Sequence, residues 1–226
     1  MPTDPLDAAP DVPCSEDLRD PVQAKAWADA ADRRRPLRVR VRAVVVAQLA
    51  RLPRAARVLE LGSGPGFLAE RVLAHCPHLA GYTLFDVSEP MLQMSRARVG
   101  RYAAATFALG DFRSEGWAGS VQGLFDAVVS MQAVHEVRHK RRVPRLYSQI
   151  HDLLTPGGLF LMCDRTPEDD SARSTALFMT AAEQLQALRG AGFVDVRVVM
   201  SGDALALCEC RRSGGRRTRG TSTPAA

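Results

Sequence analysis

Residues 60–66 read Glu-Leu-Gly-Ser-Gly-Pro-Gly. Leu61 ends a short apolar run, and the glycines follow directly after it. Glycines in this spacing allow the backbone to turn sharply and to pass close to a bound ligand. The dinucleotide-binding fingerprint would need its third glycine at position 67, which is Phe67. The Gly-Lys-Ser/Thr sequence of a P-loop is also missing from this loop. The loop therefore predicts a ligand-binding turn of another kind.

Two acidic residues follow later predicted strands. Asp86 ends a predicted strand at 81–86, and an acid at this point can accept hydrogen bonds from two ribose hydroxyls. Asp111 follows a predicted strand at 105–109, where it could accept from an exocyclic amine while Phe112 packs on a purine face. Either acid alone fits a helix cap or a loop residue. Their joint placement at successive strand ends favours a nucleoside site.

Short apolar runs alternate with helical patterns from position 57 onward, which predicts a parallel sheet covered by helices on both faces. Ser201-Gly202-Asp203 joins the last two strands, and so short a turn predicts an antiparallel hairpin. Ligands of such sheets bind at the carboxyl ends of the strands. The expected strands are 57–61, 81–86, 105–109, 125–130, 159–163, 193–200 and 204–210, and the expected helices are 15–34, 37–51, 66–75, 89–99, 141–154 and 172–190.

This set of features resembles the class I S-adenosylmethionine-dependent methyltransferases over about residues 37–210. The features are the glycine loop, the two strand-end acids, the strand that begins Phe125-Asp126 and the turn Pro156-Gly157-Gly158. The resemblance implies an α/β fold, a Rossmann-like three-layer αβα sandwich with a seven-stranded, mostly parallel sheet and one antiparallel strand. It also implies that S-adenosyl-L-methionine binds and leaves as S-adenosyl-L-homocysteine. The residues that would bind it are Glu60, Gly62, Ser63, Gly64, Gly66, Asp86, Val87, Met91, Asp111, Phe112, Met131 and Gln132.

By the same resemblance, these residues fall into groups along the cofactor. Gly62 to Gly66 would follow the methionine and ribose parts, and Asp86 would hold the ribose. The adenine would lie among residues after the second and third strands: Val87, Met91, Asp111 and Phe112. The sulfonium would lie beside the end of the fourth strand: Ser130, Met131 and Gln132. Glu60 would contact the methionine amine or act through a neighbouring group.

Residues 135–139, His-Glu-Val-Arg-His, match the H-E-x-x-H zinc motif, which on a helix places two histidines on one face with a glutamate as base. Three features count against a metalloprotease. Arg138 and the cations at 140–142 would repel a divalent metal, and Pro144 limits the helix. The motif also follows the fourth strand directly, where the resemblance places the acceptor. We therefore predict no metal site.

His135 is the candidate for a catalytic role in methyl transfer. In-line displacement draws much of its rate from positioning, and a base is needed only where the acceptor must lose a proton. The ordinary pKa range of histidine suits such a base. The alternative is that His135 caps the loop after the fourth strand.

The net charge of +5 arises from the end of the chain, because residues 1–210 sum to zero and residues 211–226 carry five arginines and no acid. Basic segments at 33–57 and 137–145 leave open an RNA methyltransferase with an arginine-rich surface. A catalytically silent, methyltransferase-like interaction protein is a further alternative. However, Ser130–Ala133 stands where enzymes that methylate base amino groups carry Asn/Asp-Pro-Pro-aromatic. We favour a small-molecule acceptor and disfavour nucleic acid as a partner.

Composition and patterning also predict the organisation of the chain. We expect a disordered N-terminus at 1–14, a helical lid at 15–52, the cofactor-binding domain at 53–211 and a disordered basic tail at 212–226. The N-terminus has no signal-peptide pattern, and no apolar run is long enough to span a membrane. Five cysteines without a C-x-x-C pair fit a reduced, cytoplasmic protein. The sequence leaves the oligomeric state unknown.

Overall fold

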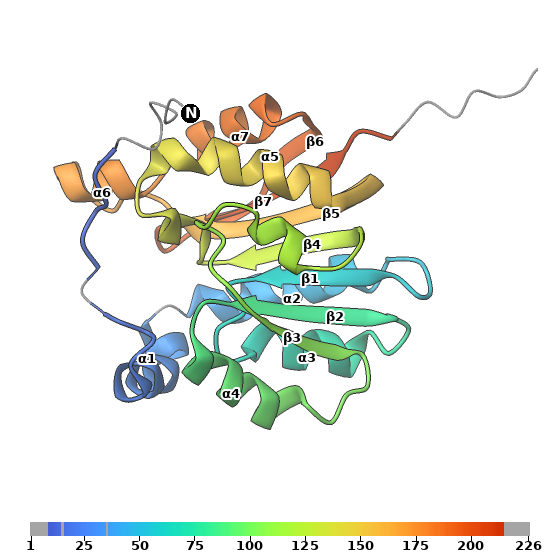
Figure 1. Ribbon diagram of the computed structural model, residues 1–226. Helices are drawn as coiled ribbons and strands as arrows, with labels where there is room; N and C mark the ends of the chain where they lie inside the picture. The colour runs from blue at the N-terminus through green and yellow to red at the C-terminus, as the bar shows by residue number, and fades with distance from the viewer. Residues whose placement is uncertain (1–8, 15, 35, 215–226) are drawn as a thin grey trace, which may run out of the picture.

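The computed structural model describes residues 9–14, 16–34 and 36–214, with a seven-stranded sheet at the centre (Figure 1). The strand order is β3-β2-β1-β4-β5-β7-β6, in which β7 is antiparallel to both of its neighbours. This confirms the expected sheet with one antiparallel strand. The strands are β1 (Arg57–Leu61), β2 (Gly81–Asp86), β3 (Ala105–Leu109), β4 (Phe125–Met131), β5 (Leu154–Arg165), β6 (Phe193–Gly202) and β7 (Leu205–Arg212).

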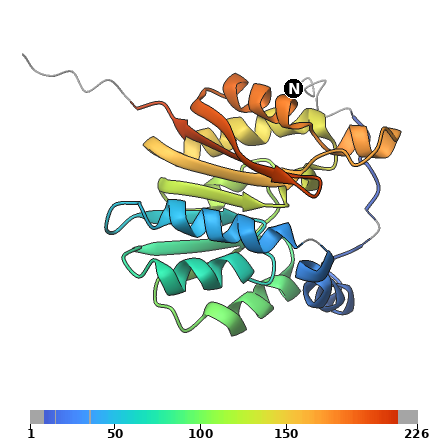
Figure 2. The ribbon, with the colours of Figure 1, turned by 180° about the vertical axis from the view of Figure 1, so that it is seen from behind.

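Helices cover both faces of the sheet, as Figures 1 and 2 show from opposite sides. Successive residues of β1 point into two different cores, so that Val58 packs with α2 and α3 while Leu59 packs with α5. Strands buried on both faces explain the continuous apolar runs in the sequence and confirm the three-layer sandwich. The helices are α1 (Pro21–Arg34), α2 (Leu37–Leu49), α3 (Phe67–His75), α4 (Glu89–Val99), α5 (Val143–Leu153), α6 (Ala172–Leu177) and α7 (Ala181–Gly190), with 3-10 turns η1 (Trp117–Ser120), η2 (Val134–Val137) and η3 (Lys140–Arg142).

The predicted hairpin of β6 and β7 is present, with its turn at Asp203 and Ala204. Both residues have positive φ, 47° and 51°. Two adjacent left-handed residues are typical of the type I′ turn, whose twist matches that of the flanking strands.

The helix expected over 172–190 is two helices in the structure, so that expectation was wrong. Phe178 is extended, with φ −104° and ψ 143°, and it ends α6. Thr180 then caps α7, because its hydroxyl accepts from the Glu183 amide at 3.2 Å while the Glu183 carboxylate accepts from the Thr180 amide at 2.7 Å. Such a reciprocal capping box starts a new helix rather than continuing the old one.

The first helix starts later than the sequence suggested. Asp20 caps α1, since its Oδ1 accepts from the amides of Val22 and Gln23 at 3.0 Å and 2.8 Å. Pro21 at the first helical position is already suited to this start. Ser15, the expected cap, lies outside the described residues.

Residues 9–14 pass the carboxyl ends of the strands on the left of Figure 1, before the chain enters α1. They belong to the segment that we expected to be disordered, and Ala9 and Val12 are buried against the fold. The rest of that expectation, at 1–8, and most of the expected tail, at 215–226, fall outside the described residues. Among the described helices, none combines the length and apolarity needed to cross a membrane.

Candidate active site

The glycine loop connects β1 to α3 at the carboxyl edge of the sheet. Gly62, Gly64 and Gly66 all have positive φ, between 54° and 81°. A Cβ on Gly62 would come within 2.1 Å of the Cβ of Ala133, so the loop and the segment after β4 are in direct contact there. The amide of Gly62 donates to the Phe85 carbonyl at 2.8 Å, which ties the loop to β2. The loop therefore presents its backbone at a fixed place on this edge.

Asp86 lies beside the loop at the end of β2 and is 8% exposed. Its Oδ2 accepts from the Gly64 amide at 2.7 Å, and its Oδ1 accepts from the Ser88 amide at 2.9 Å. Burial raises the pKa of Asp86, while the hydrogen bonds from Ser88 and Gly64 act in the opposite direction. A carboxylate oxygen has a second lone pair, so each can still accept from a ligand hydroxyl.

Glu60 is buried inside the same edge, and the Tyr82 hydroxyl donates to its Oε2 at 2.8 Å. Burial raises the pKa of Glu60 to about 8; the charge of Asp86 adds to this, whereas the Tyr82 hydrogen bond and Arg42 oppose it. Burial thus favours the protonated form of Glu60. A ligand ammonium group nearby would favour the ionised form.

Ser63 Oγ in the glycine loop and Gln132 Nε2 directly after β4 are buried polar atoms without a hydrogen-bond partner among the described residues. Gln132 has a positive φ of 59°, its amide donates to the Cys163 carbonyl at 2.7 Å, and its Oε1 accepts from Arg38 Nε. Buried polar groups nearly always find a partner. These two orphaned groups therefore fit a polar ligand lying along the loop, as a bound S-adenosylmethionine would.

At the end of the site expected to hold adenine, the carboxylate of Asp111 already pairs with arginines. Asp111 Oδ2 lies 2.9 Å from Arg113 Nη2 and 3.5 Å from Arg19 Nη2. Partial burial acts to raise the pKa of Asp111, but its hydrogen bonds and charge pairing with Arg113 outweigh this and lower it. Val87 is 39% exposed at the end of β2, whereas Met91 is buried in α4. Phe112 is partly buried and packs on the core beneath α5.

His135 stands in the turn after β4 and is held by Asp164 from the end of β5. Its Nδ1 lies 2.6 Å from Asp164 Oδ1, and its amide donates to Asp164 Oδ2 at 2.7 Å. On the other side of the ring, Nε2 lies 3.3 Å from Glu136 Oε1. Burial acts to lower the pKa of His135, but Asp164 and Glu136 outweigh it and raise the pKa to about 9. Histidine held by a carboxylate at one ring nitrogen has the geometry of an oriented base.

Asp164 was not among the site residues predicted from the sequence. The signal was present, because Asp164 follows the apolar run of β5 just as Asp86 ends that of β2. Applying the same strand-end rule to the fifth strand would have found it.

The two histidines of the H-E-x-x-H motif do not share a helical face. The 3-10 turn η2 ends at Val137, and Arg138 takes a left-handed conformation with φ 66°. His139 instead caps η3, with its side chain accepting from the Arg141 amide at 3.2 Å. No cluster of three metal-ligating side chains occurs within the described part of the chain.

A wide groove of about 590 Å³ lies at the opposite end of the sheet, between the end of α2 and strands β6 and β7. Arg51, Arg197 and Arg211 line it, together with Leu159 near the amino end of the parallel part of β5. It shares no residue with the predicted site, so its size does not bear on the chemistry at the carboxyl edge.

Comparison with known families identifies the domain. Residues 58–158, which run from β1 into β5, match a family described as a methyltransferase domain. This match covers a little under half of the chain, and the fold of the described residues is the class I methyltransferase fold. The chain resembles in fold an O-methyltransferase family protein from Burkholderia thailandensis, with TM-score 0.66, 20% identity, and coverage of 87% of this chain and 61% of that one.

Two further proteins are similar to it. Human N-acetylserotonin methyltransferase, in complex with S-adenosylmethionine, has TM-score 0.65 and 18% identity and covers 88% of this chain and 58% of its own. The tetracenomycin polyketide synthesis 8-O-methyl transferase TcmO of Streptomyces glaucescens is 31% identical over 169 residues, which are 66% of this chain and 48% of TcmO. The chain thus spans about half the length of that relative.

Proposed function

We propose that this methyltransferase transfers the methyl group of S-adenosylmethionine to a hydroxyl of a small-molecule acceptor, with His135 as the base. The observation that carries the proposal is the position of His135. Asp164 fixes its Nδ1, and the segment that bears it packs on the glycine loop through Ala133.

The residues of the site have separable roles in this reaction. S-adenosylmethionine, when bound, supplies an electrophilic methyl group on its sulfonium. The glycine loop, Asp86 and Glu60 would hold the nucleoside and amino acid parts, and Ser63 and Gln132 would gain the partners that they lack. His135 Nε2 would take the proton from the acceptor hydroxyl as its oxygen bonds to the methyl carbon and the carbon–sulfur bond breaks. Asp164 would orient the ring and stabilise the imidazolium.

Two considerations favour a hydroxyl acceptor. A hydroxyl must lose its proton during transfer, and that step gives the oriented base a purpose. TcmO is named as an 8-O-methyl transferase of polyketide synthesis. The B. thailandensis protein is likewise named an O-methyltransferase.

The first test is calorimetric titration with S-adenosylmethionine. We expect binding to the full chain, at least about tenfold weaker in Asp86→Ala because that change removes charge-assisted hydrogen bonds. Asp152→Ala is the matched control, since Asp152 is an exposed acid outside the site. Absence of binding, or equal affinity in wild type and Asp86→Ala, would contradict the proposal and favour a silent fold.

The second test follows labelled methyl transfer to a panel of phenolic small molecules and, in parallel, to tRNA. We expect transfer to a phenol that falls at least about a hundredfold in His135→Gln, within the range typical of general-base catalysis. Transfer to tRNA alone would support the RNA alternative instead.

A further inference from the structure

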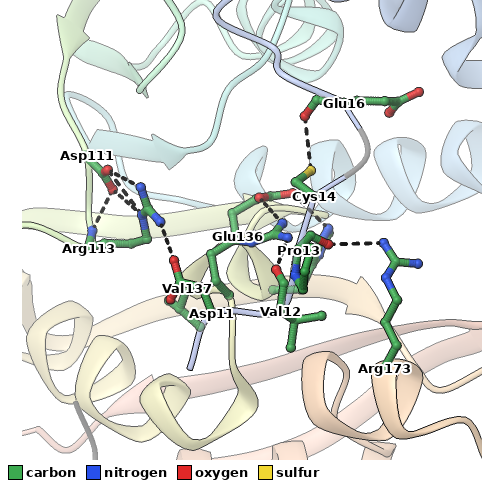
Figure 3. A network of polar contacts seen from close by, with 12 residues as sticks. Asp11, Val12, Pro13, Cys14, Glu16, Asp111, Arg113, Glu136, Val137 and Arg173 are labelled. Carbon is green, nitrogen blue, oxygen red and sulfur yellow. Dashed lines mark hydrogen bonds and ion pairs between the residues drawn. The ribbon is translucent and has the colours of Figure 1, made fainter. Parts of the chain in front are cut away.

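Residues 9–14, here called the N-terminal strap, lie across the side of the site where Glu136 and Asp111 stand (Figure 3). The Val12 amide donates to the Arg138 carbonyl at 2.8 Å, and the Arg138 guanidinium donates back to the Val12 carbonyl. Val12 also packs against Leu177 and Phe178, and the Phe178 ring lies edge-on to His135 at 5.3 Å. The strap thus packs on the residues that surround His135, the proposed base.

The strap places one carboxylate between two arginines. Asp11 Oδ2 lies 3.5 Å from Arg113 Nη1, and Asp11 Oδ1 contacts Arg142 Nη1. These arginines come from different parts of the fold, the turn after β3 and the 3-10 turn η3. Two guanidinium groups that converge on one carboxylate make a site of the kind that recognises carboxylate and phosphate groups.

Both arginines are oriented by contacts other than Asp11. Arg142 Nη1 also donates to the Val137 carbonyl at 2.9 Å, and Arg113 Nη2 lies 2.9 Å from Asp111 Oδ2. The two cations would therefore keep their places if Asp11 moved away. Preorganised donors lose little conformational entropy when they bind an external anion.

A small cavity of about 40 Å³ opens beside the pair, with Phe112, Val137 and Leu146 among its walls. Arg145 adds a third guanidinium to its rim. This space is enough for about three or four water-sized groups, since one water needs about 10–15 Å³. The pair therefore has adjacent room for an anionic group larger than a single atom.

The ion pairs of Asp11 with Arg113 and Arg142 are weak. Its side chain is 54% exposed, and those of Arg113 and Arg142 are 37% and 20% exposed. Ion pairs this open to solvent contribute only about 0–1 kcal/mol. An anion presented by a ligand that also binds elsewhere in the site can displace it.

The pair is also connected to the proposed base. The hydrogen bond to Asp111 does most to raise the pKa of Arg113, and the charges of Asp11 and Glu136 add smaller effects in the same direction. Glu136 in turn contacts His135 Nε2. We propose that Arg113 and Arg142 form an anion-binding subsite for a carboxylate or phosphate of the acceptor, and that Asp11 occupies it until the acceptor binds. This inference rests on the proposed function, because it assigns the substrate class of the same site.

The test is calorimetric titration of the full chain with inorganic phosphate and, separately, with benzoate, at constant ionic strength set by chloride. Asp11→Asn removes the internal competitor and should tighten binding of the preferred anion about two- to fivefold, the equivalent of an exposed ion pair. Arg142→Gln and Arg113→Gln should each weaken it at least about tenfold. Arg141→Gln is the matched control, because it removes the same charge from an exposed neighbour that does not line the subsite.

Hydrogen exchange of the Val12 amide reports strap release, since that amide is bonded to the Arg138 carbonyl. We expect faster exchange when the anion is bound and in Asp11→Asn. Unchanged anion affinity in Asp11→Asn, or an equal loss in Arg141→Gln and Arg142→Gln, would overturn the subsite. S-adenosylmethionine titrations of the same variants keep the two ideas apart, because loss of cofactor binding with intact anion binding would refute only the proposed function.

Discussion

Glu136→Gln should lower the pKa of His135 by about one unit. The carboxylate oxygen of Glu136 lies 3.3 Å from His135 Nε2, and its side chain is 42% exposed. Because the His135 side chain is only 12% exposed, a water-like dielectric constant gives the lower limit for a unit charge pair at that distance, about 1.3 kcal/mol. That energy is equivalent to about one pKa unit. The titration midpoint of His135 should therefore move from about 9 in the wild type to about 8 in Glu136→Gln.

Such a shift strongly changes the fraction of His135 that is neutral and can accept a proton. With a midpoint near 9, about 1% of His135 is neutral at pH 7, and a drop of one unit raises this to about 10%. The turnover of Glu136→Gln at pH 7 should then exceed that of the wild type, by up to about tenfold if proton removal limits the rate.

The direct assay is an NMR pH titration of the histidine ring resonances, with His135 assigned from the spectrum of His135→Gln. It requires no acceptor. Glu115→Gln is the control, because it removes an acid that is 92% exposed and pairs with Arg145. A His135 midpoint at or below 6.5 in the wild type, or one that Glu136→Gln leaves unmoved, would refute the electrostatic reasoning.

Three further predictions concern stability. Gly62→Ala should destabilise the fold by about 1–3 kcal/mol in urea melts, since it adds a Cβ 2.1 Å from that of Ala133 at a positive φ. The double variant with Ala133→Gly should recover part of this loss, and no recovery would show that the contact is not the cause. His135 has a folded-state pKa above its unfolded value of 6.5, so its contribution is complete below pH 6.5 and is lost as pH rises through about 9. Wild type should lose up to about 3 kcal/mol over that window, and His135→Gln should show a flatter profile in melts at each pH. Thr180→Ala should cost about 1 kcal/mol by removing the α7 cap, and a Tm equal to that of wild type would contradict this assignment.

The regular part of the fold was predictable because its signals are local. The strand at 81–86 and the helix at 89–99 coincide with β2 and α4, since each has an apolar pattern bounded by a turn or cap residue. The break between α6 and α7 has a local signal too, the Thr180-x-x-Glu183 capping box, which the apolar periodicity of 172–190 obscured.

Other features had no local signal. Residues 9–14, Ala-Pro-Asp-Val-Pro-Cys, contain two prolines and have no helix or strand periodicity, and they belong to an acidic, proline-rich start of the chain that is typical of disorder. They are held mainly through backbone groups, such as the Ala9 carbonyl at 2.5 Å from Arg142 Nη2, and any sequence presents such groups. The interaction of Asp11 with Arg113 and Arg142 joins residues more than a hundred positions apart, so only the folded chain reveals it.

The place of β7 in the sheet has a consequence for synthesis of the chain. β7 lies between β5 and β6, yet along the sequence it is the last strand of the described residues, ending at Arg212. During translation, the edge of β5 therefore lacks its partner until the residues up to Arg212 have left the ribosome. Residues 159–163 of that edge are apolar and would be prone to intermolecular pairing in the meantime. Premature termination before residue 205 should for this reason yield an aggregating product rather than a smaller stable fold.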